Sequence, residues 1–82
     1  EPQTIRFNYY GPSVEAVLDK FPMAKVVDEQ EEVCSIEAEV FGTGVKMWLL
    51  SQGSKVKVTA PETLVQEMRA EIQKMQEVAD KA

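Results

Sequence analysis

The residues of this sequence that could take part in chemistry are few, and their types do not combine into a reaction centre. Cys34 is the one cysteine in 82 residues, and histidine is absent. The commonest general base, a Ser-His-Asp triad and the usual zinc ligand sets are therefore missing. A lone cysteine cannot form an internal disulfide, and Cys34 fits best as a small buried side chain on a strand. We expect no catalytic residue, and we predict that the protein is not an enzyme.

Three short segments are candidates for binding an ion or a phosphate group. The acidic run Asp28–Glu32 lacks the spaced oxygen ligands and the glycine of a calcium loop, which favours a solvated turn. The loop Tyr10–Ser13 has no basic residue and too few glycines to surround an anion. The segment Gly42–Gly44 is too short to indicate phosphate binding. We therefore predict neither a metal site nor a bound cofactor.

Charge and hydropathy argue against two further classes of protein. The chain carries 14 acidic and 9 basic residues, a net charge of −5, which disfavours direct binding to a nucleic-acid backbone. No apolar run approaches the roughly 20 residues of a membrane helix, and no charged-then-apolar leader opens the chain. With its single cysteine, a reducing cytoplasmic setting is expected. Because residue 1 is Glu rather than Met, we expect residues 1–82 to be one domain of a longer protein.

The spacing of apolar residues predicts the elements that must position these side chains. Alternation of apolar and polar residues is typical of half-buried strands, and apolar residues three and four apart are typical of helices. The strands are expected at residues 4–10, 24–28, 33–41 and 55–59, and the helices at residues 14–21, at residues 44–51 and from Pro61 onward. The second and third strands, joined by a short acidic turn, are expected to be antiparallel neighbours.

The order of these elements predicts an α+β fold of a particular kind. A β-α-β-β-α-β succession is that of the ferredoxin-like sandwich, here with an additional C-terminal helix. Right-handed crossovers would place the first two helices on the same face of the sheet. The expected order of the strands across the sheet is fourth, first, third, second.

The sheet face away from the first two helices is the candidate docking surface. The residues expected to contact a partner there are Arg6, Tyr10, Lys25 and Lys57, with Val27 and Lys55 beside them. Arg6 is expected to face Glu37 or Glu39, so that opposite charges meet across the strands. Two interpretations follow, either a solvated face that neutralises its own charges or a docking face for another domain or subunit.

The C-terminal helix is expected to carry one apolar stripe. The stripe comprises Leu64, Met68, Ile72, Met75 and Ala79. Packing within the chain is the favoured interpretation, because ordering 82 residues costs on the order of 100 kcal/mol of conformational entropy and most apolar surface must be used internally. An interface with a partner is the alternative. Trp48 is likewise expected in the core, because Val45 and Leu49 flank it at helical spacing.

The second half of the sequence resembles a known family. A helix ending Trp48-Leu-Leu-Ser-Gln-Gly53, a short valine-rich strand and Pro61-Glu-Thr-Leu64 opening a terminal helix resemble the WCX domain. This domain is the C-terminal extension of WYL-domain transcriptional regulators, often described as DeoR-like or YafY-like. The upstream order of elements is similar too, so the resemblance covers nearly all of the chain. Two features depart from the family: Gln52 stands where an aromatic residue is frequent, and the predicted hairpin lacks the common Asp-Gly turn.

The resemblance implies a bacterial regulatory and dimerisation domain. In that family a winged helix-turn-helix binds DNA, a barrel carrying Trp-Tyr-Leu senses an effector that is often a nucleic acid or nucleotide, and the WCX domain helps to dimerise and position both. The implied partners are the chain's own upstream WYL-type domain and a second subunit. DNA would be contacted only through the N-terminal domain, and no membrane is involved. One alternative stays open: a stand-alone module of split β-α-β fold that senses a small ligand.

Overall fold

The chain folds into a four-stranded sheet and three helices within residues 2–42 and 44–82, the part that this computed structural model describes. The strands are β1 (Pro2–Tyr9), β2 (Lys25–Glu29), β3 (Cys34–Phe41) and β4 (Val56–Ala60). The helices are α1 (Val14–Lys20), α2 (Gly44–Ser51) and α3 (Glu62–Ala79), and a 3-10 turn, η1 (Gly53–Lys55), precedes β4. The predicted α+β class is confirmed. The segment Gly42–Gly44, considered above as a phosphate site, includes residue 43, which lies outside the described residues.

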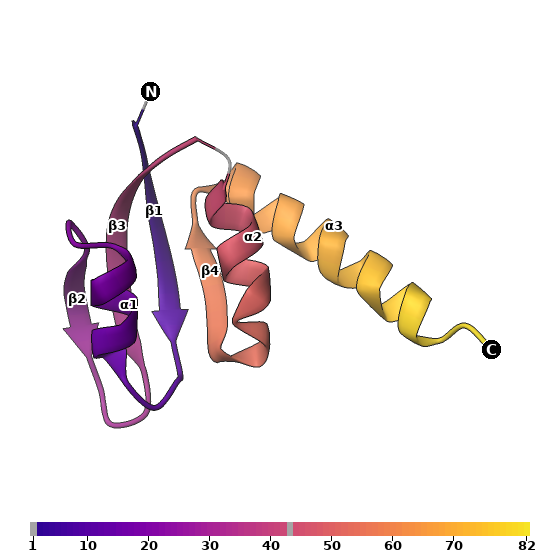
Figure 1. The fold of residues 1–82 in the computed structure, drawn as a ribbon, viewed down its shortest axis with the longest axis horizontal. Helices are drawn as coiled ribbons and strands as arrows, with labels where there is room; N and C mark the ends of the chain where they lie inside the picture. Colours follow the sequence, from indigo (N-terminus) through magenta and orange to yellow (C-terminus); the bar gives the residue numbers. More distant parts are fainter. Residues whose placement is uncertain (1, 43) are drawn as a thin grey trace.

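All neighbouring strands of the sheet are antiparallel, in the order β2-β3-β1-β4 (Figure 1). The two central strands, β1 and β3, are also the two with the clearest alternation of buried and exposed residues. On β1 the side chains of Ile5, Phe7 and Tyr9 are buried, as the alternation predicts. Because a strand turns successive side chains to opposite faces, Arg6 and Asn8 lie on the other face.

Helices α1 and α2 lie on the same face of the sheet, in front of it in Figure 1. Three aromatic rings join the two helices to that face. The ring centroid of Phe7 on β1 lies 6.4 Å from that of Phe21 at the end of α1 and 6.1 Å from that of Trp48 on α2. Phe21 and Trp48 meet edge to face at 4.9 Å. Such pairs contribute about 0.5–1.5 kcal/mol each beyond the area they bury, and the prediction that Trp48 packs in the core is confirmed.

Strand β2 differs from its prediction in position and in register. It runs from Lys25 to Glu29, and its pairing with β3 shifts at Val27. Val26 lies opposite Ile36 and Asp28 lies opposite Ser35, so Val27 has no opposite residue and forms a bulge. Val27 therefore takes no register position beside Lys25, and its place on the open face stays a prediction. The bulge depends on the pairing with β3, which the local alternation does not encode.

Strand β4 begins one residue later than predicted, because the chain before it turns tightly. Gly53 has a φ of +62°, a conformation that glycine adopts at little cost, and it lies just after the end of α2. The amide of Lys55 then donates to the carbonyl of Gln52 at 3.2 Å, which places Lys55 in η1 rather than in the strand. The carbonyl of Lys55 still accepts a hydrogen bond from the amide of Tyr10 at 2.7 Å.

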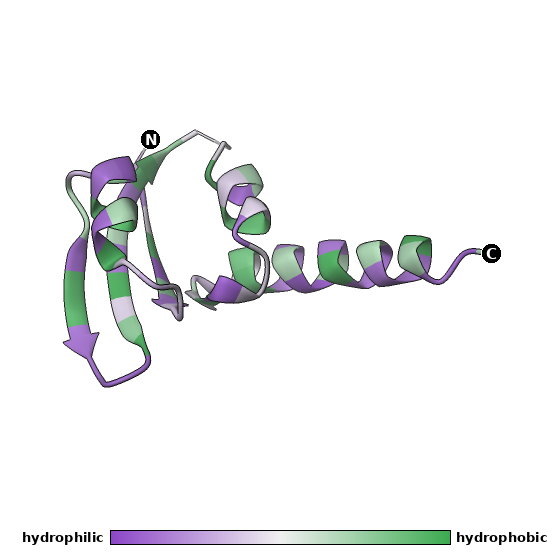
Figure 2. Ribbon diagram, turned by 60° about the horizontal axis from the view of Figure 1, so that its bottom comes forward, coloured by the Kyte–Doolittle hydropathy of each residue, from purple (hydrophilic) through white to green (hydrophobic). Residues whose placement is uncertain are grey.

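Helix α3 packs on the body of the domain over its first turns only. Leu64 and Met68 are buried, whereas Ile72 and Met75 are 53% and 51% exposed. The expectation that the stripe is core is therefore wrong beyond Met68. Beyond Met68 the helix extends away from the body, past the edge of the sheet that β4 forms (Figures 1 and 2). No other described element covers this part of the helix. The radius of gyration, 13.2 Å, exceeds the about 12 Å of a compact domain of this length.

Candidate functional site

The candidate docking face is built from one row of charges across three strands. Arg6 on β1 lies opposite Glu37 on β3, and Lys25 on β2 lies opposite the same Glu37. The Nε and Nη2 atoms of Arg6 lie 2.9 Å and 2.7 Å from Oε2 of Glu37. The predicted pairing of Arg6 is thus confirmed, with Glu37 as its partner. Because the Arg6 side chain is 55% exposed, the pair contributes only about 0.2–1 kcal/mol.

A second, more polar row lies next to the first. Lys57 on β4 lies opposite Asn8, whose Oδ1 accepts a hydrogen bond from the hydroxyl of Ser35 at 2.9 Å. Asp28 on β2 closes this row opposite Ser35. Lys57 therefore lies one row away from Arg6, so the sheet brings Arg6, Lys25 and Lys57 together on one face.

Tyr10, the remaining predicted residue, lies beyond the end of β1 and outside these rows. It is exposed and borders a hollow of about 410 Å³ together with Gly11 and the acidic turn between β2 and β3. Tyr10 therefore belongs to the rim of the face, next to the turn. Strand β1 ends at Tyr9, before Gly11, so Tyr10 has no opposite residue in the sheet register. Contact of any of these residues with a partner stays a prediction.

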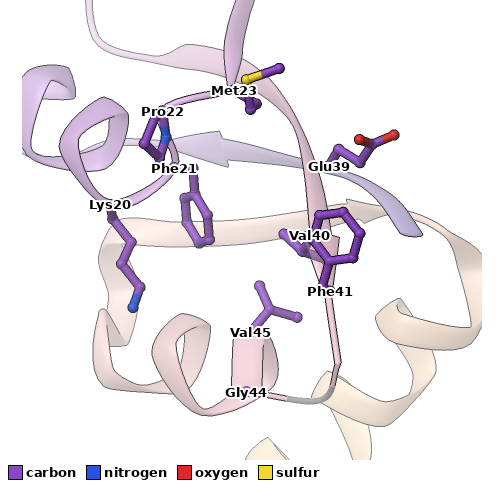
Figure 3. Close-up of a pocket in the computed structure, with 9 residues that line it drawn as sticks. All are labelled: Lys20, Phe21, Pro22, Met23, Glu39, Val40, Phe41, Gly44 and Val45. Atoms are coloured by element: carbon purple, nitrogen blue, oxygen red, sulfur yellow. The ribbon is translucent and has the colours of Figure 1, made fainter. Parts of the chain in front are cut away.

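A groove that the sequence does not predict lies beside the end of β3 (Figure 3). It has a volume of about 440 Å³ and runs between the end of α1, the end of β3 and the start of α2. Its lining residues are Lys20, Phe21, Pro22, Met23, Glu39, Val40, Phe41, Gly44 and Val45. Met23 and Phe41 are 76% and 71% exposed, an unusual place for large apolar side chains. The sequence gives one signal of this groove. Met23 follows Pro22 and Phe41 precedes Gly42, so both side chains lie next to residues that end a helix or a strand, and neither belongs to the predicted buried positions of these elements.

A third surface is the distal stripe of α3, defined by Ile72, Met75, Val78 and Ala79. All four side chains are exposed. Glu71, Lys74 and three residues of the stripe also border a shallow hollow of about 300 Å³ on the helix surface. An amphipathic helix normally buries such a stripe against another element. The distal stripe is therefore an apolar surface without a partner among the described residues.

Comparison with models of known protein families identifies the family of this chain. The model of the WCX domain matches residues 1–76, which is almost the entire sequence. The chain belongs to the WCX domain family. WCX domains are associated with WYL-domain regulators, and the predicted resemblance is confirmed. No curated protein and no solved structure matched the chain. The matched range contains the whole open face and the groove, whereas the last part of the distal stripe, beyond residue 76, lies outside it.

The side chains of this WCX domain that could bind or react are dispersed over its described residues. Cys34 lies on β3 and packs against the core cluster, as predicted, but it is only half-buried. Within residues 2–42 and 44–82 no three His, Cys, Asp or Glu side chains gather closely enough to hold a metal ion. None of the described helices is both long and apolar enough to cross a bilayer. What this part of the chain offers is surface: a charged sheet face, an apolar groove and an uncovered helix stripe.

Proposed function

We propose that this WCX domain is the C-terminal regulatory and dimerisation module of a bacterial transcriptional regulator that also contains a helix-turn-helix and a WYL-type domain. The observation that carries the proposal is the family match over residues 1–76, since WCX domains are associated with such regulators. The net charge of −5 supports a role in which another domain contacts DNA. The strand order and the shared face of α1 and α2 support assignment of the fold to the ferredoxin-like class.

The open face supports docking by its rigidity and by its charges. Four paired strands fix the positions of Arg6, Lys25 and Lys57, and within the described residues no ion pair engages the ammonium groups of the two lysines. Carboxylates on an upstream domain would pair with these cations. Such pairs set the orientation of a partner and the rate of its association more than they raise affinity. The domain would thereby hold the sensing domain in a defined position.

The test uses the full-length regulator with Arg6→Glu and Lys57→Glu together. Two repulsive contacts replace two attractive ones, so we expect the effector response or the dimer to weaken roughly tenfold, equivalent to about 1.4 kcal/mol. The control is Lys46→Glu, a charge reversal on α2 that lies outside both the open face and the groove, and it is compared with Arg6→Glu and Lys57→Glu made singly as well as together. Effector titration and analytical ultracentrifugation measure the two responses.

Two results would contradict this proposal. If the double reversal behaves like the control variant, the open face is not a docking surface. If the reading frame upstream of Glu1 encodes neither a helix-turn-helix nor a barrel with Trp-Tyr-Leu, the chain is not the C-terminal module of such a regulator. Circular dichroism of the isolated variants separates loss of docking from loss of folding.

A second candidate function, sensing of a small ligand by the domain itself, is favoured by the groove. Its volume of about 440 Å³ lies within the roughly 300–1,000 Å³ of small-molecule sites, and Lys20 and Glu39 lie at opposite sides of an apolar floor (Figure 3). Lys20 could pair with the carboxylate of an apolar ligand.

Thermal denaturation of the isolated chain with a panel of apolar carboxylates and amino acids tests this second function. A ligand at a hundredfold its Kd adds about 2.7 kcal/mol and should raise Tm by roughly 10 °C or more. Phe41→Asp should abolish the rise and Met47→Asp, an equally exposed position on α2, should retain it. If no member of the panel raises Tm, the ligand-sensing function is rejected.

A further inference from the structure

The hollow beside Tyr10 is lined by acidic and uncharged residues. It lies between the loop after β1 and the turn that joins β2 to β3, and its volume is about 410 Å³. Three carboxylates border it from the turn, those of Glu29, Glu31 and Glu32, and no lysine or arginine is among its lining residues. Nε2 of Gln30 donates to Oδ2 of Asp28 at 3.0 Å, so this amide is already engaged within the turn. The hollow therefore favours a ligand that carries positive charge and its own N–H donors.

Tyr9 presents a polar atom to this hollow from the core side. The residue is only 5% exposed, and its hydroxyl takes part in no hydrogen bond among residues 2–42 and 44–82. In the same part of the chain no fully buried side-chain nitrogen or oxygen lacks a partner, so the hydroxyl must be the accessible end of Tyr9. That end of the ring lies against Gly11, and both residues line the hollow. Because buried tyrosines usually pair their hydroxyl, its position here points to a ligand in the hollow.

The walls of the hollow suit the methylene groups of an organic molecule. The ring of Tyr10 is 48% exposed at the rim, and the amide of Tyr10 is held by the carbonyl of Lys55 at 2.7 Å. Val14 and Val33 are half-buried lining residues. A cation over the face of an aromatic ring is attracted by its quadrupole. The walls therefore offer apolar contact between points of negative charge.

The spacing of the carboxylates decides between a metal ion and a larger cation. Nowhere in the described part of the chain do three His, Cys, Asp or Glu side chains gather closely enough to hold a metal ion. Mg²⁺ and Ca²⁺ require several oxygen ligands at about 2.0–2.6 Å from one point. A cation whose charges are spread along a chain needs no such convergence, because each charge can pair with a separate carboxylate. The volume of about 410 Å³ lies within the roughly 300–1,000 Å³ of small-molecule sites.

We propose that this hollow binds a linear di- or polyamine, a small organic cation whose ammonium groups are separated by methylene chains. The ammonium groups pair with the carboxylates of the acidic turn, and one of them donates to the hydroxyl of Tyr9. The methylenes lie against the two valines and the ring of Tyr10. This site and its ligand differ from the groove and its apolar carboxylate. The proposal is also independent of the dimerisation function, since the site lies within one chain.

Isothermal titration calorimetry of the 82-residue chain tests the site with 1,4-diaminobutane at constant ionic strength. Two probes are matched to it: Mg²⁺ has the same charge concentrated at one point, and butylamine has the same carbon chain with one ammonium group. The diamine is expected to bind at least about tenfold more tightly than either. Equal binding of Mg²⁺ would indicate general charge attraction, and equal binding of butylamine would indicate that a lone ammonium, such as a lysine side chain of a protein, suffices. Either result, or no binding of the diamine, would overturn the proposal.

Variants test which side chains hold the diamine. Tyr9→Phe keeps the ring and removes the hydroxyl, and should weaken binding roughly three- to tenfold. Glu31→Gln with Glu32→Gln should weaken it at least about tenfold. The matched control is Glu67→Gln with Glu77→Gln, which changes the net charge equally at exposed positions of α3 and should leave the affinity unchanged. Equal losses for the two double variants, or an unchanged affinity of Tyr9→Phe, would contradict the site.

NMR of the unmodified chain locates the diamine without any substitution. In an amide proton–nitrogen spectrum, titration should shift the signals of Gly11 and of residues 29–33 most, because these residues border the hollow. The signals of α3 should move little. This measurement keeps the proposal testable if Tyr9→Phe does not fold, which circular dichroism would detect. Shifts spread evenly over the acidic residues of the chain, or centred on α3, would overturn it.

Discussion

Phe7→Ala is expected to lower the free energy of unfolding by about 3–5 kcal/mol. Phe7 is fully buried on the central strand β1 and contacts the rings of Phe21 and Trp48 edge to face. Removing it deletes apolar burial and two aromatic contacts at the point where α1, α2 and the sheet meet. Because small domains are stable by only about 5–15 kcal/mol, this loss should leave a substantial unfolded fraction at moderate urea concentrations.

Urea denaturation followed by circular dichroism measures the effect. Phe41→Ala is the matched control, since it removes the same side chain from an exposed position and is expected to change stability by no more than about 0.5 kcal/mol. Phe7→Leu provides a milder substitution if Phe7→Ala does not fold. Equal losses for Phe7→Ala and Phe41→Ala would contradict the placement of the core around Phe7.

Gly11→Ala is expected to destabilise the domain by about 1–3 kcal/mol through overpacking. A Cβ atom at residue 11 would overlap the phenol ring of Tyr9, which is buried on β1 and has little freedom to move. The requirement for glycine here is close approach rather than a special φ. For a domain of this size each kcal/mol corresponds to about 4–8 °C in Tm, so differential scanning calorimetry should resolve the change.

Gly44→Ala is the control for this prediction, because a Cβ atom at residue 44 meets no atom within 4 Å. At the first position of α2 it should be neutral or slightly stabilising, since alanine favours the helix. A double-mutant cycle tests the cause: in a Tyr9→Leu background the added cost of Gly11→Ala should largely disappear. If the cost persists there, contact with Tyr9 is not its origin.

Much of the fold follows from local spacing, because the local patterns and the tertiary structure agree. The alternation around Phe7 and Ile36 correctly predicts which side chains of the central strands are buried. The helical face of Val45, Trp48 and Leu49 correctly predicts α2, and Gly53 marks the turn after it. In each case the residues next to a position in the sequence determine whether its side chain is buried or where its helix ends.

What the sequence did not predict depends on contacts between distant segments. The bulge at Val27 exists only relative to β3, and the exposure of Ile72 reflects how far the body extends beneath α3. The groove forms because Met23 and Phe41 meet from different elements. Of the candidate site, a pairing of Arg6 with Glu37 or Glu39 could be predicted from the strand order and the alternation, whereas the choice of Glu37 depends on the register of β1 and β3 and the position of Tyr10 depends on where β1 ends.

Both outer strands of the sheet are interrupted, and this bears on aggregation. Val27 shifts the register of β2, and the pairing of β4 with β1 shifts between Arg6 and Phe7, which leaves Thr59 without an opposite residue. An outer strand with an unbroken row of amides and carbonyls can recruit a strand from another molecule and so grow a fibre, and bulges twist that row out of line. The domain can therefore expose apolar side chains to a partner, while the irregular backbone of its outer strands disfavours the growth of fibres.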